Sequence, residues 1–460
     1  MPELLIAPPE MPAFDYSPRP YTGPPREEVL AMRREFANPA LFTLYGDPLM
    51  IVEGKMQYLF DETGRRYLDM FAGIVTVSCG HCHPRVVERM REQMETLQHA
   101  TTIYLHPGMP ALARKLAFRM PPGLDVTYFV NSGSEANDLA ITMARLFTGN
   151  TDVVAVRNGY HGGSPSAMGL TSHHTWKFPI PQNAGVHHAM CPDAYRAGDA
   201  EHPEEVARRA AEDVRDTIRY STPGRIAAFI AEPIQGVGGA TAGSPNYLRE
   251  AYAIAREHGG VCIADEVQTG FGRTGDNYWG FQNFGVVPDI VTMAKGIGNG
   301  APLAAVTTTR AIAETLAQRI HFNTFGGNPV SMAAGLAVLE TIDEEGLQEN
   351  CRVVGGRLLT GLRELQIRHP LIGNVRGMGL MLGVELVTDR ATRAPARDAT
   401  LRVLEEAREM GVLLGKGGLD GNVLRIQPPM CITAEDADFA LDVLERAFAR
   451  SKEVRECVSA

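Results

Sequence analysis

The sequence lacks any block of lysine or arginine residues, and acidic residues outnumber basic ones by 54 to 44, giving a formal net charge of -10. This balance argues against a surface that binds nucleic acid. No apolar run approaches the roughly 18 residues that a membrane span needs. We therefore expect partners that are neither nucleic acids nor membranes. The remaining composition, 44% hydrophobic and 21% charged, is ordinary for a globular protein.

A disulfide framework is not expected either, because the seven cysteines are odd in number and scattered along the chain. Residues 1–25 contain eight prolines, but neither a basic segment followed by an apolar one nor an arginine-rich amphipathic pattern. These features predict a reducing, cytoplasmic setting. The proline-rich segment is expected to be either an extended arm lying over a neighbouring subunit or a disordered tail.

One cysteine cluster matches a ligand-binding pattern. Cys79-Gly-His-Cys-His83 has the spacing of covalent haem attachment, and cysteine and histidine are also the residues that bind zinc. Haem attachment requires export, for which the sequence shows no signal, and a structural zinc site needs a second, distant ligand pair. A tight turn between an apolar strand at 71–77 and a helix that begins at Pro84 explains the cluster without a ligand. We therefore predict no metal.

Short apolar runs alternate with longer helical patterns between about residues 75 and 340. The runs are continuous rather than alternating, which is typical of strands buried on both faces of a mostly parallel sheet. They lie at 126–130, 153–156, 226–231, 261–264, 290–293 and 303–306. The prediction is an α/β fold with helices on both faces of the sheet. We expect three regions: residues 1–75, an N-terminal arm with part of a small domain; 76–340, a large domain; and 341–460, the rest of a small α+β domain.

Two residues at the ends of such runs suggest a specific chemistry. Lys295 ends the run that starts at Asp289, and burial there lowers the pKa of an ammonium and leaves a nucleophile suited to a Schiff base. Alone, it is more simply a strand-end lysine that reaches solvent. Asp265 ends the run that starts at Val261. Enzymes that use pyridoxal 5'-phosphate (PLP) need both a lysine for the aldehyde and an aspartate for the pyridinium nitrogen, so the pair favours a PLP enzyme.

Two further segments could complete such a site. Asn131-Ser-Gly-Ser-Glu-Ala-Asn137 opens an amphipathic helix, whose free N–H groups and dipole suit a phosphate. Simple helix capping by Ser132 or Ser134 is the commoner case. Tyr160 follows the run at 153–156 in a glycine-containing loop, where an aromatic ring can lie on a planar ligand. Alone, it is more often a loop tyrosine.

With these residues assembled, the chain resembles the class III, or ω-amino-acid, PLP-dependent aminotransferases from about residue 39 to residue 449. The motifs that carry the resemblance are Asn131–Asn137, Tyr160-His-Gly162, Ala231-Glu-Pro-Ile-Gln-Gly236, Asp265–Arg273, Lys295 in Ala-Lys-Gly-Ile-Gly-Asn-Gly, and Asn323–Pro329. Within this family the chain is most similar to the alanine–glyoxylate aminotransferase 2 group. The resemblance implies the aspartate aminotransferase-like, fold type I architecture of PLP-dependent transferases. Its large domain binds PLP on a mostly parallel sheet, and its smaller domain is α+β.

The resemblance also implies a role for each residue that contacts the cofactor. Lys295 binds the cofactor aldehyde and then moves the proton, and Asp265 pairs with the pyridinium nitrogen. Gln268 donates a hydrogen bond to the phenolic oxygen, while Val267 and Tyr160 pack on opposite faces of the ring.

The phosphate and the polar network around the cofactor are assigned in the same way. Gly133 and Ser134 bind the phosphate together with the partner subunit's Thr324, which implies a homodimer, or a dimer of dimers, with shared active sites. Glu232 lies beside the cofactor and orders the polar groups around it.

Arg425 matches the arginine that binds the substrate carboxylate in this family, and its planar guanidinium suits two-point recognition. A surface arginine on an edge strand is the alternative. Ornithine- and 4-aminobutyrate-type members carry a glutamate five positions after the residue matching Glu232, where this chain has Val237. Without that glutamate the arginine stays free for the carboxylates of donor and acceptor alike, which favours compact amino acids.

The sequence thus predicts an aminotransferase that moves an amino group from a small α- or β/ω-amino acid, of the alanine or 3-aminoisobutyrate type, to glyoxylate or pyruvate. The expected partners are these amino acids and 2-oxo acids. A phospholyase acting on phosphoethanolamine-type amines shares nearly every motif and is the alternative, as are aminomutases and racemases; Arg425 weighs against the phospholyase. A PLP-fold protein without activity should have lost Lys295 or Asp265, and both are present.

Overall fold

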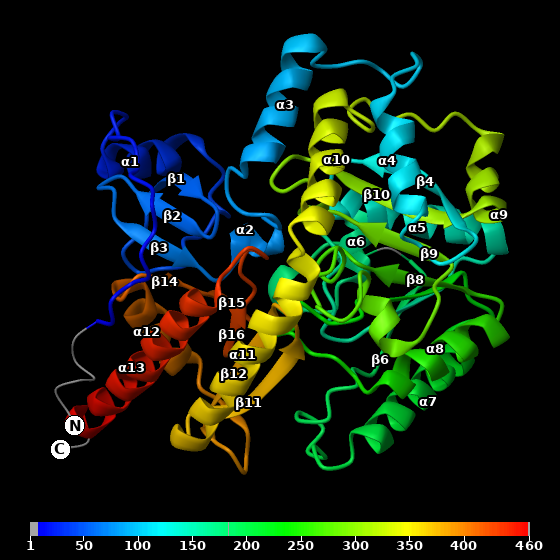
Figure 1. The fold of residues 1–460 in the computed structure, drawn as a ribbon. Coiled ribbons are helices and arrows are strands. Elements are labelled where there is room, and N and C mark those ends of the chain that lie inside the picture. Colours follow the sequence, from blue (N-terminus) through cyan, green and yellow to red (C-terminus); the bar gives the residue numbers. More distant parts are fainter. Residues whose placement is uncertain (1–7, 183, 459–460) are drawn as a thin grey trace.

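The computed structural model describes residues 8–182 and 184–458, with side chains described as far as Ser451. A seven-stranded sheet lies at the centre of the larger part of the molecule, in the order β4-β10-β9-β8-β7-β5-β6 (Figure 1). Its strands are β4 (Leu124–Val130), β5 (Val153–Val156), β6 (Val186–Ala189), β7 (Ala228–Ala231), β8 (Val261–Asp265), β9 (Ile290–Met293) and β10 (Ala304–Thr309). The strands from β9 to β6 are parallel, and β10 is antiparallel to both of its neighbours. The predicted mostly parallel sheet is confirmed.

Both faces of this sheet are buried, which is why its strands are apolar throughout. On one face, Ile263 of β8 packs in a cluster with α5 (Gly133–Thr148). On the other, Cys262 packs in a cluster with residues of α7 (Pro203–Ser221) and α8 (Pro245–Glu257). Alternate residues of each strand therefore face opposite helical layers, as the continuous apolar runs predict.

One strand of this sheet was not expected. Both His187 and His188 lie in the edge strand β6, where His187 Nε2 is 2.8 Å from Asp152 Oδ1. Polar side chains are tolerated at an edge, so the run lacks the apolar signal that identifies the inner strands.

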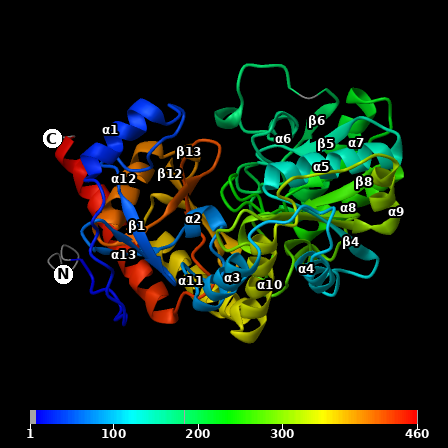
Figure 2. The same ribbon diagram turned by 90° about the horizontal axis from the view of Figure 1, so that it is seen from above.

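The smaller part of the molecule is built from both ends of the chain, which lie side by side in Figures 1 and 2. The N-terminal strands β1 (Ile51–Lys55), β2 (Tyr58–Asp61) and β3 (Arg66–Asp69) continue into β14 (Val412–Leu413), which is parallel to β3. A second sheet has the order β11-β12-β16-β15, and helices pack around both. The strands of this sheet are β11 (Ile372–Met378), β12 (Met381–Asp389), β15 (Gly415–Gly417) and β16 (Val423–Ile426), with the short β13 (Ala394–Pro395) paired to β12. The helices are α11 (Leu347–Arg368), α12 (Arg397–Glu409) and α13 (Ala434–Val458). This is the predicted α+β part.

Over the described residues 8–25 the proline-rich arm lies on the smaller part of the molecule, and a contact with a neighbouring subunit stays a prediction. It packs on its own chain: the Phe14 ring lies 4.6 Å from that of Tyr58, and Arg66 Nη2 donates to the Pro12 carbonyl at 2.6 Å. Prolines favour an extended conformation, so the arm lies along the β2–β3 pair at little entropic cost.

A left-handed turn replaces the strand expected at 71–77. The short element α2 (Ala72–Val75) has positive φ angles at all its residues, 52° at Ala72, 57° at Gly73, 64° at Ile74 and 61° at Val75. The next helix, α3 (Pro84–Thr96), begins at proline as predicted. In the cysteine–histidine cluster between them, His81 Nε2 contacts Asp69 Oδ2 at 2.7 Å and His83 Nε2 contacts Glu345, so these rings point to different partners.

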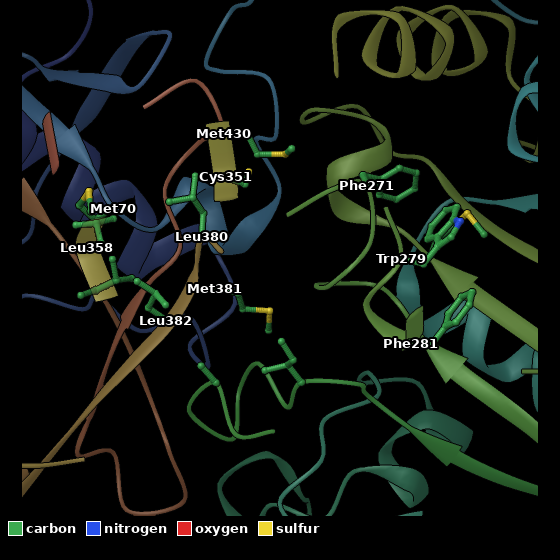
Figure 3. Packing of buried hydrophobic residues seen from close by; sticks show 14 of the residues in the cluster. Met70, Phe271, Trp279, Phe281, Cys351, Leu358, Leu380, Met381, Leu382 and Met430 are labelled. Atoms are coloured by element: carbon green, nitrogen blue, oxygen red, sulfur yellow. The ribbon is translucent and has the colours of Figure 1, made fainter. Parts of the chain in front are cut away.

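The hydrophobic core is continuous between the two parts. Figure 3 shows Phe271, Trp279 and Phe281 beside the large sheet and Leu380 and Leu382 in the smaller part, all in one buried cluster. Shared packing of this kind fixes the two parts against each other along the line where the site described next is found. Over the described residues, no helix is both long and apolar enough to cross a membrane.

Candidate active site

The predicted residues meet where the parallel strands end. Because the carboxyl ends of parallel strands lie on the same edge of a sheet, the loops that follow β5, β7, β8 and β9 converge. They enclose a cavity of about 150 Å³. Its lining contains eight of the ten predicted site residues: Gly133, Ser134, Tyr160, Glu232, Asp265, Val267, Gln268 and Lys295. It also contains Asn137, His161 and Gly162, for which no role was predicted.

Lys295 lies two residues after the end of β9 and has a positive φ of 49°, which a residue with a side chain rarely adopts. The adjoining loop is tied down, since Ser78 Oγ donates to the Gly296 carbonyl at 2.7 Å. Burial lowers the pKa of Lys295 to about 8; the negative charges of Asp265 and Glu232 oppose the shift and Arg425 adds to it. The amine is therefore accessible in its neutral, nucleophilic form near neutral pH.

Asp265 is buried at the end of β8 and accepts several hydrogen bonds. Its Oδ2 lies 2.7 Å from His161 Nδ1 and accepts from Asn137 Nδ2 at 2.8 Å. Thr292 Oγ1 in turn donates to Asn137 Oδ1 at 2.8 Å. Burial lowers the pKa of His161, but the hydrogen bond and charge of Asp265 outweigh it, so the net pKa is raised. This network fixes the carboxylate and holds a proton beside it.

His161 and Asn137 lie within motifs that the sequence singled out, yet their role was missed. The sequence did contain an indication that Asn137 has a role, because it is a polar residue on the apolar side of α5, between Ala136 and Ala140. The histidine carried no such signal, because only the fold brings it against a carboxylate 104 positions away.

The N-terminus of α5 faces the cavity and is capped by a serine, while its role in binding phosphate stays a prediction. Ser132 caps the helix by accepting from the Glu135 N–H at 3.2 Å, while Ser134 Oγ accepts from the Gly163 N–H at 3.1 Å. A side chain at Gly162 would collide with Ser134, with a Cβ only 2.3 Å from its Oγ. Backbone and hydroxyl groups are therefore packed closely around a helix N-terminus, which is the environment that binds phosphate groups.

Glu232 and Tyr160 form the opposite side of the cavity. Glu232 accepts hydrogen bonds from the Tyr160 N–H at 2.9 Å and the Gly236 N–H at 2.8 Å, and burial raises the pKa of its carboxyl group. The Tyr160 ring stands edge-on to Trp176, 5.3 Å between centroids. The carboxyl group thus shapes the two loops that carry Tyr160 and Gly236.

Arg425 lies outside the cavity lining but contacts one of its residues. Its Nη2 donates to Gln268 Oε1 and to Gln427 Oε1, both at 2.7 Å, and its guanidinium lies 5.0 Å from the centre of the Phe71 ring. The expectation of a surface residue on an edge strand is wrong, because β16 lies between β12 and β15 and Arg425 is 3% exposed. Burial lowers the pKa of Arg425 to about 10.

Thr324 is the one predicted residue that the chain does not bring to the site. It is exposed and absent from the cavity lining. This placement is compatible with a role in the site of a second subunit, as the resemblance implies.

The cavity provides the groups that PLP requires. A lysine amine, an aspartate carboxylate and a helix N-terminus line one enclosed space, and Val267 lies against Gly133, where a Cβ would be 3.2 Å from Val267 Cγ2. These groups match the aldehyde, ring nitrogen and phosphate of the cofactor. The buried Nε2 of His161 has no hydrogen-bonding partner among the described residues, which leaves a polar atom for a bound molecule.

A family model described as aminotransferase class-III matches residues 45–448. The chain belongs to the class III aminotransferases. It is 54% identical to the alanine–glyoxylate aminotransferase 2 homolog 2 of Arabidopsis thaliana over 440 residues, covering 96% of this chain and 91% of that protein. The predicted PLP-dependent aminotransferase activity and fold type I architecture are thereby confirmed.

Two solved structures add detail. The PLP-bound form of an amine transaminase from an uncultivated Pseudomonas species is 33% identical with a TM-score of 0.84, covering 90% of this chain and 98% of that one. A phospholyase from Arthrobacter in complex with phosphoethanolamine is 34% identical with a TM-score of 0.85, covering 92% and 99%. Both reactions therefore occur on this architecture.

The predicted cytoplasmic location is wrong, because the Arabidopsis relative is named as a mitochondrial protein. The prediction rested on unpaired cysteines and on the pattern of residues 1–25, and the six cysteines with described side chains are free. Free thiols indicate reducing surroundings, a property that does not separate one compartment inside the cell from another.

Proposed function

We propose that this aminotransferase transfers the amino group of a small α- or β/ω-amino acid, of the alanine or 3-aminoisobutyrate type, to glyoxylate or pyruvate. The observation that supports this best is the buried Arg425, whose guanidinium lies next to Gln268 at the edge of the cavity. A buried guanidinium binds a carboxylate strongly. Gly417, directly beside Arg425, also adjoins the Val237 carbonyl, so the residue that replaces the glutamate of other family members lies near the arginine. The name of the Arabidopsis relative supports alanine and glyoxylate among these substrates.

In this proposal PLP, when bound, supplies the electron sink that stabilises negative charge at the substrate carbon. Lys295 Nζ holds the cofactor covalently and moves the proton, for which a pKa of about 8 is well matched to neutral pH. Asp265 would pair with the ring nitrogen, Val267 and Tyr160 would pack on the ring, and Gln268 would bind the phenolic oxygen. Gly133 and Ser134 bind the phosphate, and Glu232 orders the loops around them.

We also propose a homodimer, or a dimer of dimers, in which the partner subunit's Thr324 completes the phosphate site. Large apolar side chains lie exposed on two segments, one of which adjoins Thr324 in the sequence: Ile103, Tyr104, Leu105, Ile320, Phe322 and Phe325. Apolar exposure of this extent indicates a surface that is covered in the assembled protein.

The division of the chain at residues 75 and 340 stays a prediction, and α10 (Pro329–Glu344) continues across the second boundary.

A panel of amino donors with pyruvate and glyoxylate as acceptors tests the substrate proposal. Arg425→Ala should raise KM for donor and acceptor together, because one guanidinium binds both carboxylates in turn. The loss in kcat/KM should be on the order of 2–5 kcal/mol if the carboxylate is buried. Val237→Glu should lower kcat/KM for small donors more than for donors whose amine lies far from the carboxylate. If Arg425→Ala leaves both half-reactions intact and phosphate is released from phosphoethanolamine, the phospholyase alternative is correct.

A further inference from the structure

Three consecutive backbone carbonyls lie beside the arginine site, and each accepts a hydrogen bond from a distant segment. Val237 O accepts from the Gly418 N–H at 2.9 Å, and Gly238 O from Asn158 Nδ2 at 3.2 Å. Gly239 O accepts from Arg376 Nε at 2.9 Å. Two of these donors, Gly418 and Arg376, belong to the smaller part of the molecule, so the loop is held across the junction between the two parts.

The position of this loop limits the space available to Arg425. Gly417 lies between them: a Cβ at Gly417 would be 2.6 Å from Arg425 Cδ and 2.8 Å from the Val237 carbonyl oxygen. At the other end of the loop, a Cβ at Gly236 would collide with the Gln268 side chain, 2.2 Å from its Oε1. Gln268 is itself the hydrogen-bonding partner of Arg425. A shift of the loop would therefore displace the Arg425 guanidinium by two routes, through Gly417 and through Gln268.

Packing alone does not hold the loop in place. Gly238 lines a cavity of about 460 Å³, which Asn158, Arg376 and Glu385 also line. A segment of small residues next to an open space gains little from side-chain contacts, since dispersion requires atoms on both sides. Together with the bond from the Gly236 N–H to Glu232, the three hydrogen bonds to its carbonyls therefore hold it in position.

Arg376 is itself held by an ion pair with Glu385 inside the smaller part, and the same carboxylate is tied to the larger part by a second arginine. Its Nη1 lies 2.5 Å from Glu385 Oε2, and Arg196, from the loop after β6, forms an ion pair with the other oxygen of the same carboxylate. Glu385 is only 2% exposed. A planar guanidinium can bind a carboxylate with one edge and a carbonyl with another, which lysine cannot do.

We propose that Arg376, held by Glu385 and Arg196, is a positioning residue for recognition of the substrate carboxylate, acting through the loop 236–239 on Arg425. This inference rests on the proposed role of Arg425. Arg376 touches neither the cavity lining nor Lys295, so its effect should fall on carboxylate binding and not on the chemistry at the cofactor.

The test compares alanine with ethylamine, which is alanine without its carboxylate, in single-turnover reactions of the holoenzyme. Arg376→Lys should lower kcat/KM for alanine about tenfold, chiefly through KM, with less than about a twofold change for ethylamine. Glu385→Gln should act in the same direction. Arg390→Lys is the matched control, because Arg390 also donates to backbone carbonyls, those of Ile372 and His369, but within the smaller part only. Equal losses for both amines, or no loss for alanine, would overturn the proposal.

Hydrogen exchange gives a readout that does not depend on the substrate. The backbone amides of residues 235–241 should exchange faster in Arg376→Lys holoenzyme than in wild type, and at the wild-type rate in Arg390→Lys. Unchanged exchange in Arg376→Lys would overturn the proposal even if alanine kinetics change. If wild-type enzyme fails to react with alanine but the exchange result holds, the proposed substrate is wrong and the positioning of the loop stands.

Discussion

At the scale of single residues, the burial of Lys295 predicts how its reaction with PLP depends on pH. A lysine whose pKa is lowered to about 8 by burial loses its proton as pH rises through 8, and only the neutral amine attacks an aldehyde. We expect the rate at which apoenzyme binds PLP covalently to rise with pH and level off above about 8, measured by absorbance after mixing. An ordinary lysine would show a rise that continues past pH 10.

Borohydride labelling checks the same assignment directly. Reduction of the holoenzyme should attach a pyridoxyl group to the peptide that contains Lys295, and Lys295→Ala should abolish labelling and lower turnover by several orders of magnitude. Lys115→Ala serves as the control, because Lys115 pairs with Glu340 away from the cavity. A label on any other lysine contradicts the assignment.

The carboxylate of Asp265 leads to a second residue-scale prediction. Asp265→Asn keeps the shape of the side chain but removes the charge opposite the ring nitrogen, so PLP should still bind while kcat falls roughly a hundredfold or more. Asp289→Asn is the matched control: Asp289 lies at the start of β9, where it accepts from the Cys262 N–H. Near-normal turnover of Asp265→Asn would show that a group other than Asp265 binds the ring nitrogen of PLP.

At the scale of secondary-structure elements, the left-handed turn α2 is the least expected feature. Left-handed helical geometry costs roughly 1–2 kcal/mol per residue with a side chain, and β-branched residues tolerate it poorly. Its neighbours explain why the strain persists: Phe71 lies against Arg425 at one end, and Ser78 binds the Gly296 carbonyl beside Lys295 at the other. Strained backbone is typically held in this way at functional sites.

Glycine at Ile74 should therefore stabilise the protein. The Ile74 side chain is 48% exposed, so little packing is lost, whereas the φ angle of 64° suits glycine. We expect Ile74→Gly to increase the free energy of unfolding by about 1 kcal/mol in denaturant titrations of the apoenzyme. Ile367→Gly, at an exposed isoleucine in the regular helix α11, should decrease it by a similar amount. A loss of stability at both positions would show that the turn is unstrained.

At the scale of the whole molecule, association and cofactor binding should be coupled. If the partner subunit's Thr324 completes the phosphate site, dilution into monomers should release PLP and abolish activity at the same concentration, as followed by sedimentation and absorbance. Ile103→Asp should favour the monomer, because Ile103 is 73% exposed on the apolar surface. Ile367→Asp is the control on α11. Fully active monomers would exclude a shared site.

The linear order of residues contains most of the information about the fold and the cofactor site. Continuous apolar runs identified the inner strands of the large sheet, since burial on both faces leaves a signal in every residue. Because parallel strands bring their carboxyl ends to one edge, the sequence alone assigns Asp265 and Lys295, which lie at or just after the ends of two such strands, to one site. Their motifs then indicated the family.

Only the tertiary structure decided the remaining features, because each depends on contacts between residues far apart in sequence. The raised pKa of His161 requires Asp265 beside it, and the burial of Arg425 requires β16 to lie inside its sheet. The left-handed turn at Ala72–Val75 contradicts local preference and exists because its two ends are fixed elsewhere. Patterns of hydrophobicity do not predict such contacts, because the energy of each contact comes from partners that only the fold brings together.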